Sequence, residues 1–120
     1  MSNGAFDAPW PKSGRATQAL ERWLAQAPDH VDEAALAPLF SALADTTPAP
    51  DARLPDTGVG LEMERLLSPP FVRGARYGTR CSTVLLVDEG GFTFAEHRFG
   101  ADAVAQGTTF AQLPFEANGM

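Results

Sequence analysis

The sequence predicts an α+β fold in which helices gather on one side of an antiparallel sheet. Three observations support this class: apolar residues at helical spacing before residue 68, an apolar hairpin at 77–99, and proline-rich breaks between these patterns. The chain has 120 residues, of which 44% are hydrophobic, enough for one small domain. We therefore expect a single, partial domain over residues 1–120, with a C-terminal tail at 100–120.

The first predicted helix covers residues 13–26. Ser13 is a suitable N-cap residue, and Pro28 ends the pattern. The apolar residues recur three and four positions apart, which is typical of one buried helix face. They are Ala16, Leu20, Trp23, Leu24 and Ala27.

A second helical pattern begins at Asp29 and is interrupted by Pro38. Its apolar members are Val31, Leu36, Leu39, Phe40 and Leu43. Because a proline inside a helix removes a hydrogen bond, we expect a short turn before Pro38 and a short helix after it. Three prolines then make residues 45–56 a connecting loop.

The third predicted helix covers residues 58–67, with Asp56 or Thr57 as its N-cap and the sequence SPP at 68–70 as its end. The apolar residues of this helix lie on one side, and we expect all three helices to cover the same face of the sheet. They are Val59, Met63, Leu66 and Leu67.

The hairpin turns around Gly90, so Asp88 should face Gly91, Val87 should face Phe92 and Cys81 should face Arg98. The sequence VLLV at 84–87 does not alternate, which is typical of a strand covered on both faces. The helices supply one cover, and the sequence TTFAQL at 108–113 supplies at most one weak extra strand. The chain therefore has too few strands for a stable sheet, and we expect a larger domain or a partner to complete the sheet.

The charge and composition exclude several functions. The net charge of −6 argues against nucleic-acid binding. The single cysteine cannot form an internal disulfide or build a cysteine-based zinc site alone. No apolar run reaches the roughly 20 residues that a membrane span requires, and the N-terminus lacks the apolar stretch of a signal peptide. We expect a cytoplasmic protein without a cofactor or a metal.

Three stretches of the sequence closely resemble the C-terminal half of the NRDE family, which includes the eukaryotic transport-and-Golgi-organisation proteins. They are SNGAFDAPWPK at 2–12, LPDTGVGLEMERLLSP at 54–69 and YGTRCSTVLLVD at 77–88. The resemblance covers residues 2–99 and implies part of an N-terminal-nucleophile hydrolase-like αββα sandwich. The N-terminal half that names the family, with its leading cysteine, is absent from this sequence. The partner sheet of the VLLV strand would lie in that half.

Cys81 and Ser82 are the first candidate nucleophiles. Cys81 has no histidine on its face of the hairpin, so we expect a small buried residue, and the resemblance also implies a nucleophile elsewhere. Ser82 should face His97 across the hairpin, either as a catalytic pair or as a polar cross-strand pair. Glu96 points to the opposite face, so no acid is expected to orient His97.

The hairpin entrance supplies the predicted substrate-binding residues, which are Tyr77, Thr79 and Arg80. An arginine that enters an apolar strand must be paired or must point into a cleft. One interpretation is a clamp for a carboxylate or phosphate group, and the other is an internal salt bridge to Asp7 or Asp56.

The N-terminal stretch carries two further candidates. The resemblance implies that the Asn3 amide supports an oxyanion, and the alternative is a turn before Gly4. Ser2 would become an N-terminal nucleophile if Met1 were removed, although the resemblance makes it an internal residue.

Two functions remain open from the sequence. The resemblance implies hydrolysis of amide, ester or thioester bonds, links to lipid, acyl-CoA or haem handling, and a small acyl or amide ligand, with this chain inactive by itself. The alternative is a non-catalytic binding or assembly module whose exposed sheet docks a partner chain. The expected partners are a second copy or the missing N-terminal half.

Overall fold

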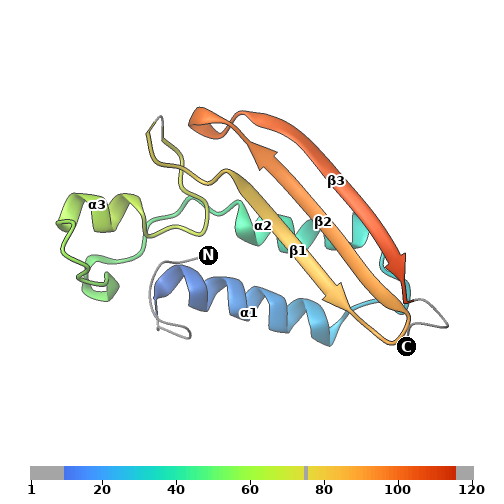
Figure 1. Cartoon of the computed structure of the whole chain (residues 1–120). Helices are drawn as coiled ribbons and strands as arrows, with labels where there is room; N and C mark the ends of the chain where they lie inside the picture. Colours follow the sequence, from blue (N-terminus) through green and yellow to red (C-terminus); the bar gives the residue numbers. More distant parts are fainter. Residues whose placement is uncertain (1–9, 75, 116–120) are drawn as a thin grey trace.

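A computed structural model, which describes residues 10–74 and 76–115, has the predicted α+β architecture (Figure 1). Two helices lie beside and behind a three-stranded antiparallel sheet, and a third helix lies beyond its end. The elements are α1 (Pro11–Ala25), η1 (Ala34–Leu36), α2 (Ala37–Leu43), η2 (Asp51–Arg53), α3 (Leu61–Leu66), β1 (Cys81–Val87), β2 (Gly91–Phe99), η3 (Ala101–Ala103) and β3 (Ala105–Pro114).

The first two helices lie where the sequence predicts them, with two corrections to α1: none of its residues is buried, and it starts earlier. Its N-cap is Trp10 and a proline occupies its first turn, so Ser13 lies inside the helix and does not cap it. The fixed φ of Pro11 suits the first helical position, which explains the earlier start. Pro38 likewise lies in the first turn of α2. The short turn η1 that the sequence predicted precedes this helix.

The sheet has the strand order β1-β2-β3, and its hairpin register is the predicted one. Cys81 pairs with Arg98, and Val87 pairs with Phe92. β3 pairs with β2 over Ala105–Pro114, so a ten-residue strand lies in the segment that the sequence suggested was mainly tail. The chain therefore reaches the three strands that a stable sheet normally needs.

The β1–β2 turn is fixed by one carboxylate and one glycine. Asp88 Oδ1 accepts the N–H groups of Gly90 at 2.7 Å and Gly91 at 3.0 Å. Gly91 has φ of +149°, and a Cβ atom there would overlap the carbonyl oxygen of Leu113 on β3. Only glycine meets both the dihedral and the space requirements at this position.

The core lies between α2 with its preceding turn and one face of the sheet. It consists of Leu36, Leu39, Phe40, Val84 and Ala95, all less than a tenth exposed. Two further side chains extend it. The ring of His97 stacks on Phe40 with centroids 3.7 Å apart, and Trp23 of α1 donates its Nε1–H to the carbonyl of Ala35 at 2.8 Å.

Helix α3 does not cover the sheet, which corrects the prediction of three helices on one face. It lies beyond the end of the sheet in Figure 1, and none of its residues belongs to the described core around α2. Its N-cap is Gly60, and neither Asp56 nor Thr57 caps it. Thr57 instead donates its hydroxyl to the buried Glu64 carboxylate at 2.6 Å, which draws the loop against the helix.

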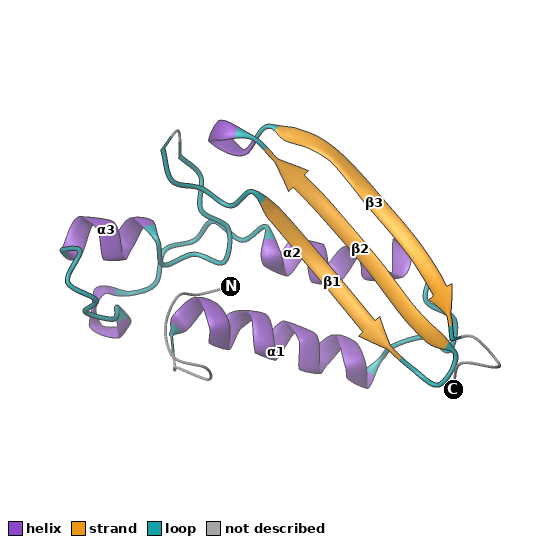
Figure 2. Cartoon of the chain, viewed as in Figure 1, coloured by secondary structure: helices purple, strands orange, loops and turns teal. Residues whose placement is uncertain are grey.

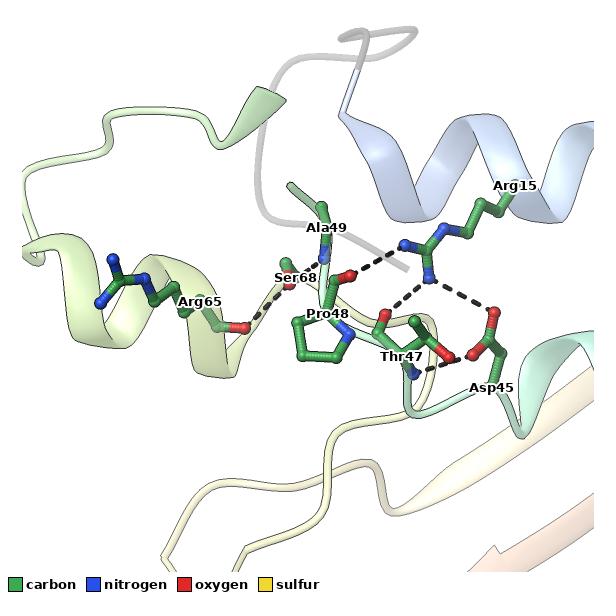
Figure 3. Close-up of polar contacts among 7 residues, drawn as sticks. All are labelled: Arg15, Asp45, Thr47, Pro48, Ala49, Arg65 and Ser68. Carbon is green, nitrogen blue, oxygen red and sulfur yellow. Dashed lines mark hydrogen bonds and ion pairs between the residues drawn. The ribbon is translucent and has the colours of Figure 1, made fainter. Parts of the chain in front are cut away.

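Polar contacts fix the loop that carries the chain from α2 to α3 (Figure 3). The Arg15 guanidinium donates to the Thr47 carbonyl at 2.6 Å and to the Pro48 carbonyl at 3.3 Å, and it pairs with Asp45 at 3.3 Å. Ser68 accepts the N–H of Ala49 at 2.8 Å. The direction in which α3 leaves the helix layer therefore depends on hydrogen bonds between distant residues.

Asp45 also accepts the N–H of Thr47 at 2.8 Å. This hydrogen bond and, less strongly, the Arg15 charge lower the pKa of Asp45. Because the folded pKa lies below the unfolded one, the carboxylate contributes stability above the unfolded pKa of about 3.9, and this contribution is lost as the pH falls through the folded value.

The substitution Gly91→Ala should destabilise the protein by at least about 2 kcal/mol, because the backbone must leave its left-handed conformation and break the contact with β3. Chemical denaturation followed by circular dichroism measures the change. Gly90→Ala is the matched control, since the nearest atom to a Cβ there would be Asp88 Oδ1 at 3.4 Å, an ordinary van der Waals distance. Equal stabilities of the two variants would contradict this account of the turn.

The substitution Asp45→Asn should lower the free energy of unfolding by about 1 kcal/mol at neutral pH, the usual effect of losing one charged hydrogen bond. The difference from the parent protein should shrink between about pH 5 and pH 2, as the parent carboxylate itself becomes protonated. Urea denaturation at several pH values measures this trend. The exposed Asp29→Asn is the control, and a difference that stays constant down to pH 2 would argue against the assigned role.

Candidate functional site

The face of the sheet opposite α2 is open, and half of it is apolar. Figure 2 shows the sheet in front of α2, with no described helix or strand over its other face. The exposed large apolar side chains on this open face are Leu85 and Val87, exposed by 59% and 61%, with Phe92 at 40% and Leu113 at 58%. Phe94, which pairs with Leu85 on the same face, is half-buried. Phe115 adds an edge-to-face contact with Phe92 at 4.9 Å. Exposed apolar side chains gathered on one side of the sheet make this face a candidate interaction site.

The other half of the open face is polar. The Thr83 hydroxyl donates to the Glu96 carboxylate at 3.1 Å, and Arg98 donates to the Thr109 hydroxyl at 2.7 Å. Glu96 and Arg98 also form an ion pair at 3.5 Å. These side chains satisfy one another across three strands, so this end of the face is a closed network of polar contacts.

Cys81 lies at the polar end of the open face and is exposed, which corrects the prediction of a small buried residue. Both faces of β1 carry apolar residues, so the sequence pattern did not show which face the helices cover. The Thr83 hydroxyl donates a long hydrogen bond to the Cys81 sulfur, at 4.0 Å. His97 points toward α2 and stacks on Phe40, so the structure brings no base to this thiol from the described histidines.

Ser82 and His97 are cross-strand neighbours, as the sequence predicted. Both face the helix layer, where Ser82 is 8% exposed. The His97 ring lies almost parallel to Phe40, with an angle of 3° between the planes. No hydrogen bond joins the two side chains within residues 10–74 and 76–115. The arrangement is therefore that of a packed polar pair, without the geometry of a nucleophile and its base.

The predicted binding residues at the hairpin entrance have different surroundings. Arg80 is exposed and donates to the Gly100 carbonyl at 3.2 Å, and its predicted salt bridge to Asp56 does not form. Thr79 exchanges hydrogen bonds with Val72, through its N–H at 2.9 Å and its hydroxyl at 3.0 Å. Tyr77 is 60% exposed. Thr79 holds the loop in place, while Arg80 and Tyr77 remain accessible to a ligand.

The predicted N-terminal candidates lie outside the described residues. These are Ser2, Asn3 and Asp7, including the predicted Arg80–Asp7 salt bridge. In the described part, no group of three histidine, cysteine or acidic side chains is arranged to hold a metal ion. No described helix is long and apolar enough to cross a membrane.

An apolar groove of about 380 Å³ runs between α1 and the outer edge of β1, and the sequence reasoning did not predict it. Small residues on the facing helices, Ala16, Ala19 and Ala42, leave this space. The signal in the sequence was the spacing of Ala16, Ala19 and Leu20 by three and four residues, which also predicts an ordinary buried stripe. None of the α1 residues is in fact buried.

Comparison of the sequence with models of known protein families finds a match to one family. The sequence model described as Transport and Golgi organisation 2 matches residues 1–101. This match confirms the resemblance drawn from the three motifs, because the NRDE family is the same family. No curated protein matches the chain.

If the role of His97 is to pack on Phe40, an aromatic side chain at position 97 should preserve the stability of the protein. We expect His97→Phe to change the free energy of unfolding by less than about 1 kcal/mol, and His97→Ala to cost about 2 kcal/mol through the lost stacking contact. Thermal and urea denaturation measure both variants. If His97→Phe were as unstable as His97→Ala, a polar role of the imidazole would have to replace this assignment.

Proposed function

Because the chain belongs to the Transport and Golgi organisation 2 family, we propose that it supplies one sheet of a two-sheet, hydrolase-like αββα assembly and has no catalytic activity alone. The open face of β1, β2 and β3 would pack against a second sheet. That sheet would come from a polypeptide that carries the nucleophile.

The uncovered apolar half of the sheet carries this proposal. Leu85, Val87 and Leu113 are each more than half exposed. In a two-sheet sandwich, side chains of this kind interdigitate between the sheets. Burial of one such side chain contributes roughly 1.5–3 kcal/mol.

The chemistry of the assembly is proposed from the family resemblance. It would be hydrolysis of an amide, ester or thioester bond, with links to lipid, acyl-CoA or haem handling. The described residues contribute no nucleophile–base pair, which supports a non-catalytic role for this sheet. Arg80 and Tyr77 at the hairpin entrance are the accessible residues that would hold the carboxylate or phosphate of a small acyl or amide ligand. The single cysteine favours a reducing, cytoplasmic setting.

The second candidate is an assembly module whose open face docks a second copy or an unrelated partner chain. The same apolar half of the sheet favours it, because a two-fold dimer would pair Leu85 and Leu113 of one copy with the same face of the other. The mass of the protein in solution separates pairing with a second copy, which gives a dimer, from the first candidate, which gives a monomer.

We expect the purified chain to show no thioesterase or amidase activity above background, and Cys81→Ala and Ser82→Ala to leave that result unchanged. It should bind the dye ANS, because its apolar face is open. The double variant Leu85→Lys and Leu113→Lys should lose most of the dye fluorescence and keep its stability within about 1 kcal/mol, since both side chains are exposed.

Leu24→Lys is the matched control, because Leu24 is similarly exposed, at 56%, but lies on α1 away from the open face. Activity that disappears in Cys81→Ala or Ser82→Ala would overturn the non-catalytic role. A dimer of the parent chain that the double variant converts to a monomer would favour the second candidate.

A further inference from the structure

Glu64 is a buried acidic residue of α3, and one of its two carboxylate oxygens has no hydrogen-bond partner. The residue is only 7% exposed. Its Oε1 atom accepts the Thr57 hydroxyl at 2.6 Å, whereas Oε2 accepts no hydrogen bond from residues 10–74 or 76–115. It is the one buried side-chain oxygen or nitrogen of these residues that is left in this state. Because a buried acceptor without a donor is costly, this oxygen requires a physical explanation.

A pocket of about 420 Å³ lies beside Glu64, between η2, the loop at 54–60 and the start of α3. Arg65 donates to Asp51 at 2.9 Å, and this contact holds η2 against α3 beyond the end of the sheet (Figure 1). The pocket volume lies within the range of roughly 300–1,000 Å³ that is usual for small-molecule sites. The apolar lining consists of Leu54, Pro55 and Leu61, and the carboxylates come from Asp51, Asp56 and Glu64.

The charge around this pocket is negative. Asp51 is already paired with Arg65, so Asp56 and Glu64 are the lining carboxylates that have no cationic partner among the described residues. No lysine or arginine of the described chain lines the pocket. The free N–H groups at the start of a helix contribute only about half a positive charge. The carboxylates therefore dominate, and the pocket favours a cation.

The geometry favours a compact organic cation. Because Thr57 occupies Oε1, a guanidinium group cannot bind both oxygens of Glu64, which is its preferred contact with a carboxylate. The described residues contain no group of three histidine, cysteine or acidic side chains that could hold a metal ion. A primary ammonium group can donate one N–H to a single oxygen and direct the other two to neutral acceptors or water.

Access to the Oε2 atom of Glu64 requires a movement of the loop, which Thr57 fastens to the carboxylate. The rest of this loop has few neighbours. A Cβ atom added at Gly58 or Gly60 would meet no neighbouring atom within 4 Å, and Val59 is 49% exposed. An outward shift of residues 57–60 would therefore open Oε2 to a ligand at little cost in packing.

We propose that the pocket beside Glu64 binds a small primary alkylammonium ion, free in solution, which donates an N–H to Oε2 of Glu64. Its alkyl chain would lie on the apolar lining, and the exposed Asp56 would attract the charge. This site is independent of the proposed function, because α3 contributes no residue to the open face of the sheet. The failure of one proposal can thus be distinguished from the failure of the other.

NMR titration of the isotope-labelled full chain with n-butylammonium chloride tests the proposal. The amide signals of Thr57, Gly60 and Leu61 should shift and reach saturation with a Kd of about 1 mM, a reasonable affinity for so small a ligand. The neutral alcohol n-butanol has the same alkyl chain but no charge. It should leave these signals unchanged at the same concentrations.

A pair of glutamate variants tests the role of the orphan oxygen. Glu64→Gln keeps the size of the side chain and removes its charge, so it should weaken n-butylammonium binding at least about tenfold, the usual effect of losing a charged hydrogen bond. Glu62→Gln is the matched control. It removes the same charge from the same helix, but Glu62 is exposed and does not line the pocket, so binding should be unchanged.

Thermal unfolding of the parent chain provides a second measurement that does not depend on the folding of a variant. At a concentration ten times its Kd, n-butylammonium chloride should raise the Tm by about 5 °C relative to the same concentration of sodium chloride, because it binds the folded state alone.

Four results would overturn the proposal. The absence of a saturable shift at n-butylammonium concentrations far above the expected Kd would exclude the site. Binding that is equally strong in Glu64→Gln would show that the cation does not use the orphan oxygen, and equal shifts with n-butanol would show that the pocket does not recognise charge. Much tighter binding of N-acetyl-lysine methylamide would identify a lysine side chain of a partner protein in place of a free amine.

Discussion

The whole structure depends on the one-sided packing of α2 against the sheet. The buried core joins α2 and its preceding turn to the sheet; its members are Leu36, Leu39, Phe40, Val84 and Ala95. The described side chains contain no second core on the other face of the sheet. Helix α1 joins this core mainly through Trp23. The α2–α3 loop is tied to α1 by the charged contacts of Arg15 and to the end of α3 by Ser68. A fold that rests on one layer of contacts leaves its remaining apolar surfaces available.

Two of those surfaces have different physical character. The open face offers side chains, and its polar half is already satisfied by the contacts among Thr83, Glu96, Arg98 and Thr109. The outer edge of β1 has no neighbouring strand in the described chain, and it offers backbone groups beside an apolar groove. The net charge of −6 opposes non-specific association of chains that expose such surfaces, because like charges repel. Specific complementarity is then required for docking.

The hairpin was the most predictable part of the fold, and the position of α3 the least. The turn residues Asp88 to Gly91 determine the register by local chemistry, so Val87 opposite Phe92 followed from the sequence. The position of α3 depends on contacts such as Arg15 with Thr47, 32 residues apart, which no local pattern encodes. The same limit applies to the site: alternation placed Cys81 and Leu85 on one face, but only the packing of α2 determined that this face is the exposed one.

The open face and the outer edge of β1 share residues, so a cover on one changes the surroundings of the other. Thr83, Leu85 and Val87 present backbone groups to the edge and side chains to the face. A second sheet on the open face would bury the side chains of Leu85 and Val87. A protein with a single layer of core is suited to such an assembly, since the second sheet would complete the core on the side of β1 that the helices leave open.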